Sequence, residues 1–397
     1  MFQKATIAEQ LDRWRKLLRF VRIYGPGRTL YKAAGRMRLR VPQLGRTRGT
    51  NIGLIGCGQF AFATIGYYLQ RYFRRGILAC YDVDEQATRT LARSLRVLRA
   101  CSSVEELFET PELGLVYIAS DHASHADYAA RALDRGLDVY VEKPIAVTEE
   151  QLLTLLRARV RSVGRLFAGY NRPFSKAICI LRSLTKVDLS GGITLGCFIV
   201  GHRLGPEHWY RRPEQGTRVC GNIGHWLDLF VHMLCWRSLP DKLDIAITWA
   251  DYEERDDNIC IAIRSDRGDL FSVILTSRNE PFEGINETIN FQHGDTTARI
   301  DDFRRMTVWQ AAKLKKYRFW PKDVGHREAI GQPFALLPGR AWHEVELSTL
   351  LMLHITEMVR LGEQQSTFSF AQEWTRIEAA IDEGVGRPSP TCNSRSH

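Results

Sequence analysis

The feature that most constrains the fold is the stretch NIGLIGCGQFAFATIGYYL at residues 51–69. It combines a short apolar strand, a G-x-G-x-x-A turn formed by Gly56, Gly58 and Ala61, and a helical pattern. In a dinucleotide-binding βαβ unit, the first glycine permits the tight turn, the second lets the backbone approach the pyrophosphate, and the small third residue lets helix pack on strand. The stretch therefore predicts a Rossmann-type domain in which the turn, with Gln59 and Phe60, binds a dinucleotide at a helix N-terminus.

A second apolar stretch, GILACYDVD at residues 76–84, contains an acidic residue at the expected strand end. Asp82 lies 24 positions after Gly58, close to the separation of roughly 20 that is typical of the ribose-binding acid. A carboxylate there accepts hydrogen bonds from the ribose hydroxyls and repels a 2′-phosphate. We therefore expect NAD rather than NADP, although Asp82 could also be an ordinary surface turn residue.

A lysine follows another predicted strand in VYVEKPIAVTEEQ, residues 139–151. Three β-forming residues are ended by Pro144, and the spacing of Thr148 and Gln151 predicts a capping box that opens a helix. Lys143 and the preceding Glu142 then lie at the carboxyl edge of a parallel sheet, where open α/β folds bind ligands.

Together these pieces resemble the Gfo/Idh/MocA oxidoreductases, the family of glucose-fructose oxidoreductase and inositol dehydrogenase. The resemblance is carried by GLIGCGQFA, by IASDHASHADYAARAL (118–133) against a threonine-proline-asparagine-x-x-His turn, and by VEKPIAVT against a Glu-Lys-Pro motif. It continues through GYNRPFSKA (169–177), EHWYRRPEQG (207–216), GNIGHWLDL (221–229) and IDDFRRM (300–306).

The resemblance implies an α/β protein with an N-terminal Rossmann domain and a second α/β domain built on a large, mostly antiparallel, open sheet. Strand-like runs such as KLDIAITWAD and NICIAIRSD, divided by turn residues, independently suggest a meander in the second domain. We expect a basic extension at residues 1–48, the dinucleotide-binding domain at 49–165, a substrate and oligomerisation domain at 166–335, and a helical return and tail at 336–397. In such proteins the open sheet face often forms the subunit contact, so a homo-oligomer is expected.

The resemblance also implies catalytic roles for Lys143 and His225. A histidine with a pKa near 6.5 suits removal of the hydroxyl proton as hydride leaves, and a lysine ammonium stabilises the developing alkoxide. Many relatives carry an acid three or four positions before the histidine, whereas this chain has Asn222 and Gly221. Asn222 can hydrogen-bond but cannot ionise, so a relay through a carboxylate is in doubt. A helix-face histidine satisfied by a neighbour and a surface lysine in an ion pair are the structural alternatives.

Further cofactor contacts are expected from Glu142, from Lys143, which would face the nicotinamide as well as the substrate, and from the turn containing Ser120, His122 and His125. Either histidine could instead cap the following helix or pack against it.

Besides His225, four residues with anion-binding or ring-stacking side chains are expected to bind the substrate, because the planar guanidinium of Arg can bind phosphate through two hydrogen bonds and Trp stacks on rings. They are Arg172, His208, Trp209 and Arg212, each of which could also be structural. The motifs most resemble relatives associated with surface polysaccharides, which predicts an NAD-dependent nucleotide-sugar dehydrogenase, with free sugar or inositol oxidation as the alternative. A non-catalytic regulator of the same fold and an NAD-dependent glycoside-cleaving enzyme stay open.

The formal charge of +10 is concentrated at one end of the chain. Residues 1–50 hold 13 Lys or Arg and 2 acidic residues, whereas the remainder holds 42 and 43, so the body is nearly neutral and no nucleic-acid partner is expected. The basic segment has a helical apolar stripe formed by Ile7, Leu11, Trp14, Leu18 and Val21, and Gly25-Pro26-Gly27 then breaks the helix. It could bind an anionic membrane surface, or pack on its own domain or a partner subunit.

Nine cysteines are scattered without a C-x-x-C pair, and no secretory signal or 18-residue apolar run is seen. We therefore interpret the cysteines as core residues rather than metal ligands, expect no metal, and expect a cytoplasmic protein.

Overall fold

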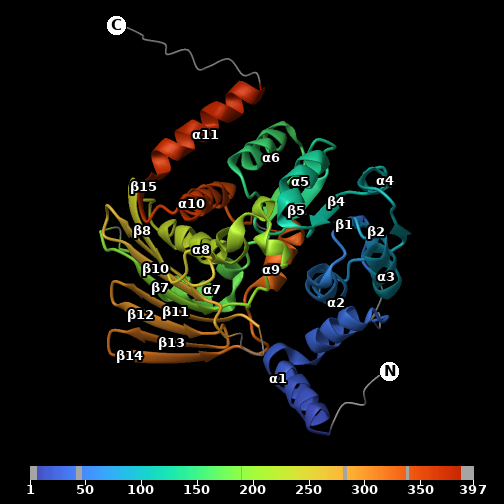
Figure 1. Cartoon of the computed structure of the whole chain (residues 1–397), viewed down its shortest axis with the longest axis horizontal. Coiled ribbons are helices and arrows are strands. Elements are labelled where there is room, and N and C mark those ends of the chain that lie inside the picture. Colours follow the sequence, from blue (N-terminus) through green and yellow to red (C-terminus); the bar gives the residue numbers. More distant parts are fainter. Residues whose placement is uncertain (1–6, 42–46, 189, 280–283, 337–338, 386–397) are drawn as a thin grey trace.

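The computed structural model describes residues 7–41, 47–188, 190–279, 284–336 and 339–385, arranged as two sheets with helices between and around them (Figure 1). Within those ranges, no helix is both long enough and apolar enough to cross a bilayer. Two buried apolar clusters form the core. One lies beneath the Gly-rich turn, and the larger one runs from the first sheet into the second.

The first sheet is the parallel sheet that the sequence predicts, with the order β3-β2-β1-β4-β5-β6. Its order reverses between β1 and β4, which places a ligand crevice at the carboxyl ends of these two strands. The strands are β1 Ile52–Ile55, β2 Ile77–Tyr81, β3 Arg99–Ala100, β4 Leu115–Ile118, β5 Asp138–Val141 and β6 Leu166–Ala168. Because β6 pairs with β5, this sheet extends just past the boundary expected at residue 165.

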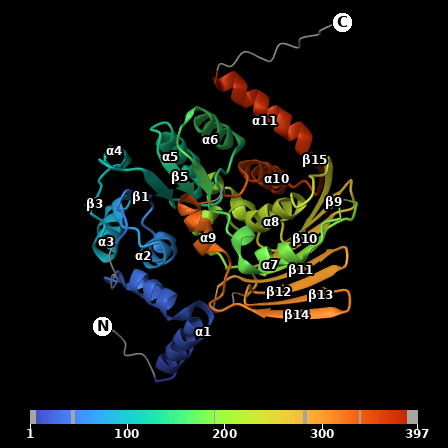
Figure 2. The ribbon, with the colours of Figure 1, turned by 180° about the vertical axis from the view of Figure 1, so that it is seen from behind.

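Helices and helical turns connect these strands on both faces of the first sheet (Figure 2). They are η1 Ala61–Gly66, α2 Tyr67–Arg71, α3 Glu85–Leu95, α4 Val104–Phe108, η2 His122–Ser124, α5 His125–Leu133 and α6 Glu149–Arg161. The predicted cap of α6 is present, since Thr148 Oγ1 accepts a hydrogen bond from the Gln151 backbone N–H at 3.2 Å. It fixes where the chain leaves β5.

The second sheet has nine strands in the order β14-β13-β12-β11-β7-β10-β9-β8-β15. It is not a simple meander, because β7 lies between β10 and β11 and runs parallel to β10. The strands are β7 Thr194–Val200, β8 Lys242–Trp249, β9 Ile259–Ser265, β10 Leu270–Thr276, β11 Asn286–His293, β12 Thr296–Asp301, β13 Arg305–Gln310, β14 Lys313–Arg318 and β15 Gln365–Ser369. Buried and exposed residues alternate along β10 and β11, which is the pattern of a sheet with one covered face.

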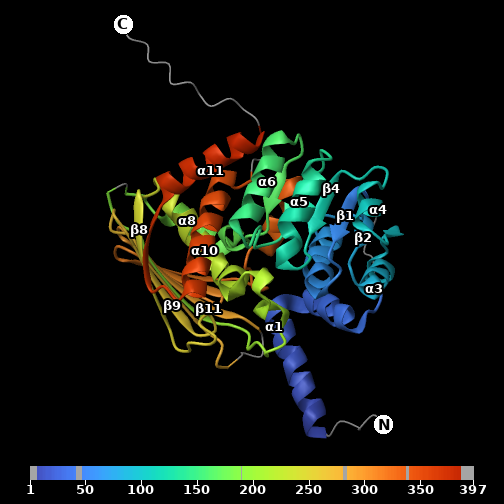
Figure 3. The ribbon, with the colours of Figure 1, turned by 45° about the horizontal axis from the view of Figure 1, so that its top comes forward.

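Helices α7, α8 and α10 lie on the covered face of this sheet (Figures 1 and 2). The helical elements of this part are η3 Arg172–Phe174, α7 Lys176–Leu184, η4 Trp209–Arg211, η5 Pro213–Gln215, η6 Val219–Ile223, α8 Gly224–Leu234, α9 His326–Gly331, η7 Gln332–Phe334, α10 Trp342–Leu361 and α11 Phe370–Val385. The C-terminal segment joins the two sheets, because β15 pairs with β8 while α11 packs on α6 (Figure 3).

The N-terminal helix α1, Ile7–Met37, has two halves separated by Gly25, whose φ is 78°. The first half projects from the body (Figure 3), with Trp14 63% and Leu18 59% exposed. The second half packs on η1 and buries Tyr31 and Ala34. The predicted break at Gly25-Pro26-Gly27 is therefore a kink. The side chains of Ile7 and Leu11 in the predicted apolar stripe lie outside the described residues.

Candidate active site

The Gly-rich turn has the geometry that a bound dinucleotide requires. Gly56 has a φ of +89°, and a Cβ there would lie 2.4 Å from the Ala119 carbonyl oxygen, so only glycine fits. A Cβ at Gly58 would meet no atom within 4 Å, which leaves its backbone open to a ligand. Ala61 is fully buried where the helix meets the strand. The turn therefore fits the pyrophosphate of NAD, as the sequence predicts.

Asp82 follows β2 and its carboxylate lies against this turn. Asp82 Oδ2 accepts from the Cys57 backbone N–H at 2.6 Å, and Oδ1 accepts from the Asp84 N–H at 2.9 Å. The carboxylate thus lies beside the Gly-rich turn, and it also helps to hold that turn in place.

Lys143 lies just beyond β5 and reaches the second domain. Its Nζ donates to the Gly221 carbonyl oxygen at 2.7 Å. Burial lowers the pKa of this ammonium to about 8, against the opposing effect of the neighbouring Glu142. Burial likewise raises the pKa of Glu142, whose Oε1 accepts from the Tyr140 hydroxyl at 2.9 Å.

His225 lies in the first turn of α8 and is 9% exposed. Burial lowers its pKa well below the usual value, and the positive charges of Arg172 and Lys143 lower it further. Its Nδ1 is buried and has no hydrogen-bond partner within the described part of the chain. A neutral imidazole with an unused ring nitrogen can take up a proton from a ligand.

Lys143 and His225 line the same cavity of about 500 Å³, together with Arg172 and with Gln59 and Phe60 of the Gly-rich turn. The remaining lining residues come from α1, from η1, from the end of β5 and from the second domain. They are Phe20, Tyr24, Arg28, Lys32, Ala63, Thr64, Glu142, Asn171, His202, Gly284, Ile285, Glu287, Lys322, Val324 and His326. The cavity thus adjoins the dinucleotide turn on one side and the second sheet on the other.

The histidines of the turn after β4 face the protein interior. His122 Nδ1 lies 3.1 Å from the Gln215 carbonyl oxygen, and its ring meets Trp209 edge-on with centroids 4.7 Å apart. His125 Nδ1 lies 2.7 Å from the Pro144 carbonyl oxygen, and its Nε2 lies 3.3 Å from that of Ser120. The contact between His125 and Pro144 helps to hold the turn that carries Lys143, and cofactor contact by Ser120, His122 and His125 stays a prediction.

Arg172 lines the cavity, but its guanidinium group is already hydrogen-bonded to another residue of the protein. Its Nε and Nη2 donate to the two carboxylate oxygens of Glu287 at 2.9 and 3.0 Å, and its guanidinium lies 4.4 Å from the Trp226 ring centroid. A bidentate contact from Arg172 to a phosphate would have to compete with this buried ion pair.

The other three predicted substrate residues do not line the cavity. His208 and Trp209 stack on each other at 5.9 Å in the segment beside His122. Arg212 is exposed and borders a separate surface pocket. The motif EHWYRRPEQG predicts that all three bind the substrate, and for residues outside the cavity this role stays a prediction.

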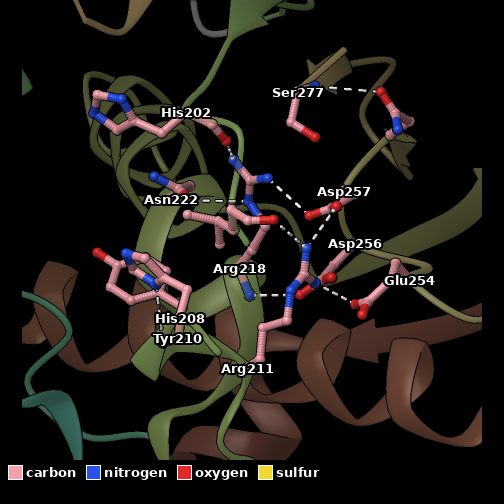
Figure 4. A network of polar contacts seen from close by, with 12 residues as sticks. His202, His208, Tyr210, Arg211, Arg218, Asn222, Glu254, Asp256, Asp257 and Ser277 are labelled. Atoms are coloured by element: carbon pink, nitrogen blue, oxygen red, sulfur yellow. Dashed lines mark hydrogen bonds and ion pairs between the residues drawn. The ribbon is translucent and has the colours of Figure 1, made fainter. Parts of the chain in front are cut away.

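Asn222, one of the two residues found where many relatives carry an acid, belongs to a network of polar contacts (Figure 4). Asn222 Oδ1 accepts from Arg218 Nε at 3.3 Å, and Arg218 also pairs with Asp257 at 2.8 Å. At Gly221 a Cβ would lie 2.5 Å from the Tyr210 ring. Position 221 therefore has no room for an acid, and the side chain at 222 is held by a buried arginine.

Several cavity residues were not predicted from the sequence. Phe20, Tyr24, Arg28 and Lys32 recur every four residues, which is a helical face, but the Gly25-Pro26-Gly27 break obscured it. His326 and Lys322 arrive from a segment far along the chain with no motif around them. No cluster of His, Cys, Asp or Glu that could hold a metal is found among the described residues.

Comparison with known proteins identifies a similar family over the Rossmann domain. Residues 50–170 match the model of the GFO_IDH_MocA family, described as an oxidoreductase family with an NAD-binding Rossmann fold. The chain is 29% identical over 173 residues to 1-carboxy-3-chloro-3,4-dihydroxycyclo hexa-1,5-diene dehydrogenase of Comamonas testosteroni, covering 44% of this chain and 42% of the relative. It is 27% identical over 203 residues to inositol 2-dehydrogenase of Ralstonia nicotianae, covering 50% and 57%. The chain spans about half the length of these curated relatives.

A solved structure shares the two-domain fold over most of the chain. The structure of GenD2 from gentamicin A biosynthesis in complex with NAD superposes with a TM-score of 0.66 at 14% identity, covering 83% of this chain and 98% of that one. At this identity the likeness extends to the fold alone.

Proposed function

We propose, from the premise that this chain belongs to the Gfo/Idh/MocA family of oxidoreductases, that it transfers hydride between NAD and a secondary alcohol or ketone of a sugar-like substrate. The observation that carries this proposal is the shared cavity, in which Lys143 and His225 lie beside the Gly-rich turn. A cofactor on that turn and a substrate in the cavity would be in contact.

In this proposal His225 is the general base for alcohol oxidation. Its buried, unpartnered Nδ1 can receive the hydroxyl proton, and its lowered pKa keeps the ring neutral and ready at physiological pH. The same cations that lower the pKa make the resulting imidazolium less favourable, so the proton must pass on quickly.

Lys143 is the electrostatic partner. One of its three N–H groups is held by the Gly221 carbonyl, which leaves two to donate to the substrate oxygen. In a buried site such a fixed positive charge stabilises a developing alkoxide far more than it would in water. NAD, when bound, supplies the hydride acceptor. Gly56, Gly58 and Asp82 would hold its phosphates and ribose.

For the substrate, we propose a nucleotide sugar, with inositol or a free sugar as the second candidate. The cavity of about 500 Å³ is large enough for more than a single sugar ring. The test is NADH formation with a panel of nucleotide sugars, free sugars and inositols. If the protein turns over none of these compounds, the proposed dehydrogenase activity is contradicted and a non-catalytic regulator of the same fold is favoured.

We further propose a cytoplasmic homo-oligomer in which the open face of the second sheet is the subunit contact. Phe198, Ile274 and Trp309 are 48%, 40% and 44% exposed on that face. Native mass spectrometry should show a defined oligomer that Trp309→Lys weakens. A monomer at micromolar concentration would exclude this contact.

The exposed half of α1 suits a weak contact with an anionic membrane surface. Trp14, Leu17 and Leu18 are exposed beside Arg15 and Lys16. Sedimentation with acidic-lipid vesicles that is reversed by salt, and reduced by Trp14→Ser, would support this contact. Unchanged sedimentation of the variant would contradict it.

A further inference from the structure

The outer wall of the cavity is formed by helix α1, which precedes the first strand of the Rossmann domain. Phe20, Tyr24, Arg28 and Lys32 all line the cavity. In Figures 1 and 3 the kink of this helix lies toward the second sheet, and its second half runs beside the Rossmann domain, where the helix ends. The N-terminal extension is therefore part of the site as well as a basic appendage.

Hydrogen bonds to both domains fix α1 in this position. On the Rossmann side, Gln59 Nε2 donates to the Lys32 carbonyl at 3.1 Å, and Arg38 Nη1 donates to the Cys57 carbonyl at 3.2 Å. On the other side, the Lys322 backbone N–H donates to the Ile23 carbonyl oxygen at 2.7 Å. A wall held from both sides can present its side chains in a defined geometry.

Within this wall, the side chain of Arg28 donates its hydrogen bonds to neutral groups. Its Nη1 and Nη2 donate to Tyr68 Oη and Thr64 Oγ1, both at a long 3.4 Å. Its guanidinium also lies 5.5 Å from the Tyr24 ring centroid and 5.4 Å from that of Tyr68. By contrast, Arg172 is paired with Glu287, and Lys322 with Asp302. Since a guanidinium has five N–H donors, Arg28 retains donors for a ligand.

A second polar group without a partner lies on the same cavity. His326 Nδ1 is buried and makes no hydrogen bond within the described part of the chain. Burial lowers the pKa of His326 well below its usual value, and the charges of Arg28 and Arg172 lower it further. A neutral imidazole can donate to a ligand oxygen, and an anion nearby would relieve the repulsion among the cations.

The position of Arg28 separates this group from the expected cofactor phosphates. The phosphates are expected at Gly56 and Gly58, whereas Arg28 bonds to Thr64 and Tyr68, more than one helical turn further along. The anion that Arg28 would meet is thus one carried by the substrate.

We propose that the substrate carries an oxyanion, a phosphate or carboxylate group, which is bound by Arg28 of α1 together with His326. The inference rests on the proposed function only in identifying the ligand as the substrate, because the anion site itself requires no more than a ligand in the cavity. It makes the N-terminal extension a determinant of specificity.

The test uses the full chain with NAD present and measures binding rather than turnover. Pyrophosphate, uridine diphosphate and glucose 6-phosphate are the phosphate probes, glucuronate is the carboxylate probe, and glucose is the neutral probe, each titrated by calorimetry. Arg28→Ala should weaken the binding of the anionic probes at least about tenfold, and Arg28→Lys should weaken their binding less. Neither substitution should change the affinity for NAD. The matched control is Arg36→Ala, the same change at an exposed position of α1 outside the cavity.

Unchanged anion binding in Arg28→Ala, an equal loss in Arg36→Ala, or a parallel loss of NAD affinity would each overturn the inference. Thermal unfolding of each variant shows whether α1 remains docked. If Arg28→Ala does not fold, Arg28→Lys, which keeps the positive charge, is used for the binding test. Preference among the probes separates phosphate from carboxylate. Arg28-dependent anion binding without turnover of any alcohol would leave the anion site standing and remove the proposed function. Turnover of neutral sugars at a rate that Arg28→Ala does not change would support the proposed function and overturn the anion site.

Discussion

The two walls of the cavity differ in how they are built. The wall that carries Lys143 and His225 consists of short motifs, each at the end of a strand or the start of a helix. The wall that carries Arg28 consists of a helix held by contacts with segments as distant as residues 59 and 322. In the proposed reaction the first wall supplies the general base and the positive charge, whereas the second wall contacts the anionic group of the substrate. Under these two proposals, a change in the segment that precedes the first strand would alter the choice of substrate and leave the reaction itself unchanged.

The largest expected effect is on turnover, from substitutions in the wall that carries Lys143 and His225. His225→Ala should lower turnover about 10²- to 10⁴-fold through loss of the general base, and Lys143→Met should cost at least as much. Both should leave NAD binding nearly unchanged, because the groups act mainly in the transition state. Steady-state NADH formation with parallel NAD titration measures this.

His208→Ala is the control for this experiment. His208 belongs to a neighbouring motif but does not line the cavity, so its loss should affect turnover much less. Near-normal turnover in both His225→Ala and Lys143→Met would show that the catalytic roles are wrongly assigned.

The next prediction compares how much each half of α1 contributes to the free energy of unfolding. Tyr31 is 6% exposed, donates to Gln70 Oε1 at 3.3 Å and meets Tyr67 edge-on at 5.0 Å. Tyr31→Ala should lower the free energy of unfolding by about 3 kcal/mol. Leu18→Ala, at a residue 59% exposed, should change it by less than about 0.5 kcal/mol. Urea unfolding curves decide this, and equal effects would mean that the second half of α1 does not dock.

Much of the first wall could be predicted from the sequence because its signals are local. Gly56 is required by its own backbone angle and the nearby strand, and Lys143 follows a strand that Pro144 ends. The second wall could not be predicted, since the kink at Gly25 resembles a helix end and His326 enters the cavity through the tertiary fold. The same limit applies to Trp209 and Arg212, which lie in a motif but do not line the cavity. Local patterns also missed β7, which inserts between β10 and β11.

A smaller effect is expected on cofactor choice. NAD should bind more tightly than NADP, and Asp82→Ala should narrow that difference by roughly tenfold, because it removes a carboxylate that repels the 2′-phosphate. Asp82→Asn separates repulsion from structure, since its amide oxygen can still accept from the Cys57 N–H. Equal affinities for both cofactors in the unchanged protein would contradict the assignment.

The pH dependence distinguishes the roles of the two catalytic groups. Because burial and nearby cations hold the pKa of His225 well below its usual value, the base should stay active as pH falls through 6.5. The pKa of Lys143 is lowered to about 8, so its charge, and with it the rate, should be lost as pH rises through that value. A rate that instead increases through pH 8 would identify Lys143 as the base. The profile of kcat/KM against pH measures both limbs.

The smallest effect concerns the position where relatives carry an acid. Asn222 lies one helical turn before His225, so a carboxylate introduced by Asn222→Asp would stabilise the imidazolium and raise the pKa of His225. The acid limb of kcat/KM should then move to higher pH. The shift should stay below about one unit, because Arg218, which already donates to Asn222 Oδ1 at 3.3 Å, would neutralise much of the new charge. Asn222→Ala removes the same hydrogen bond without adding charge and should leave the acid limb in place. A limb that moves equally in both variants would mean that Asn222 acts by positioning the helix, and that the missing acid has no electrostatic consequence for the base.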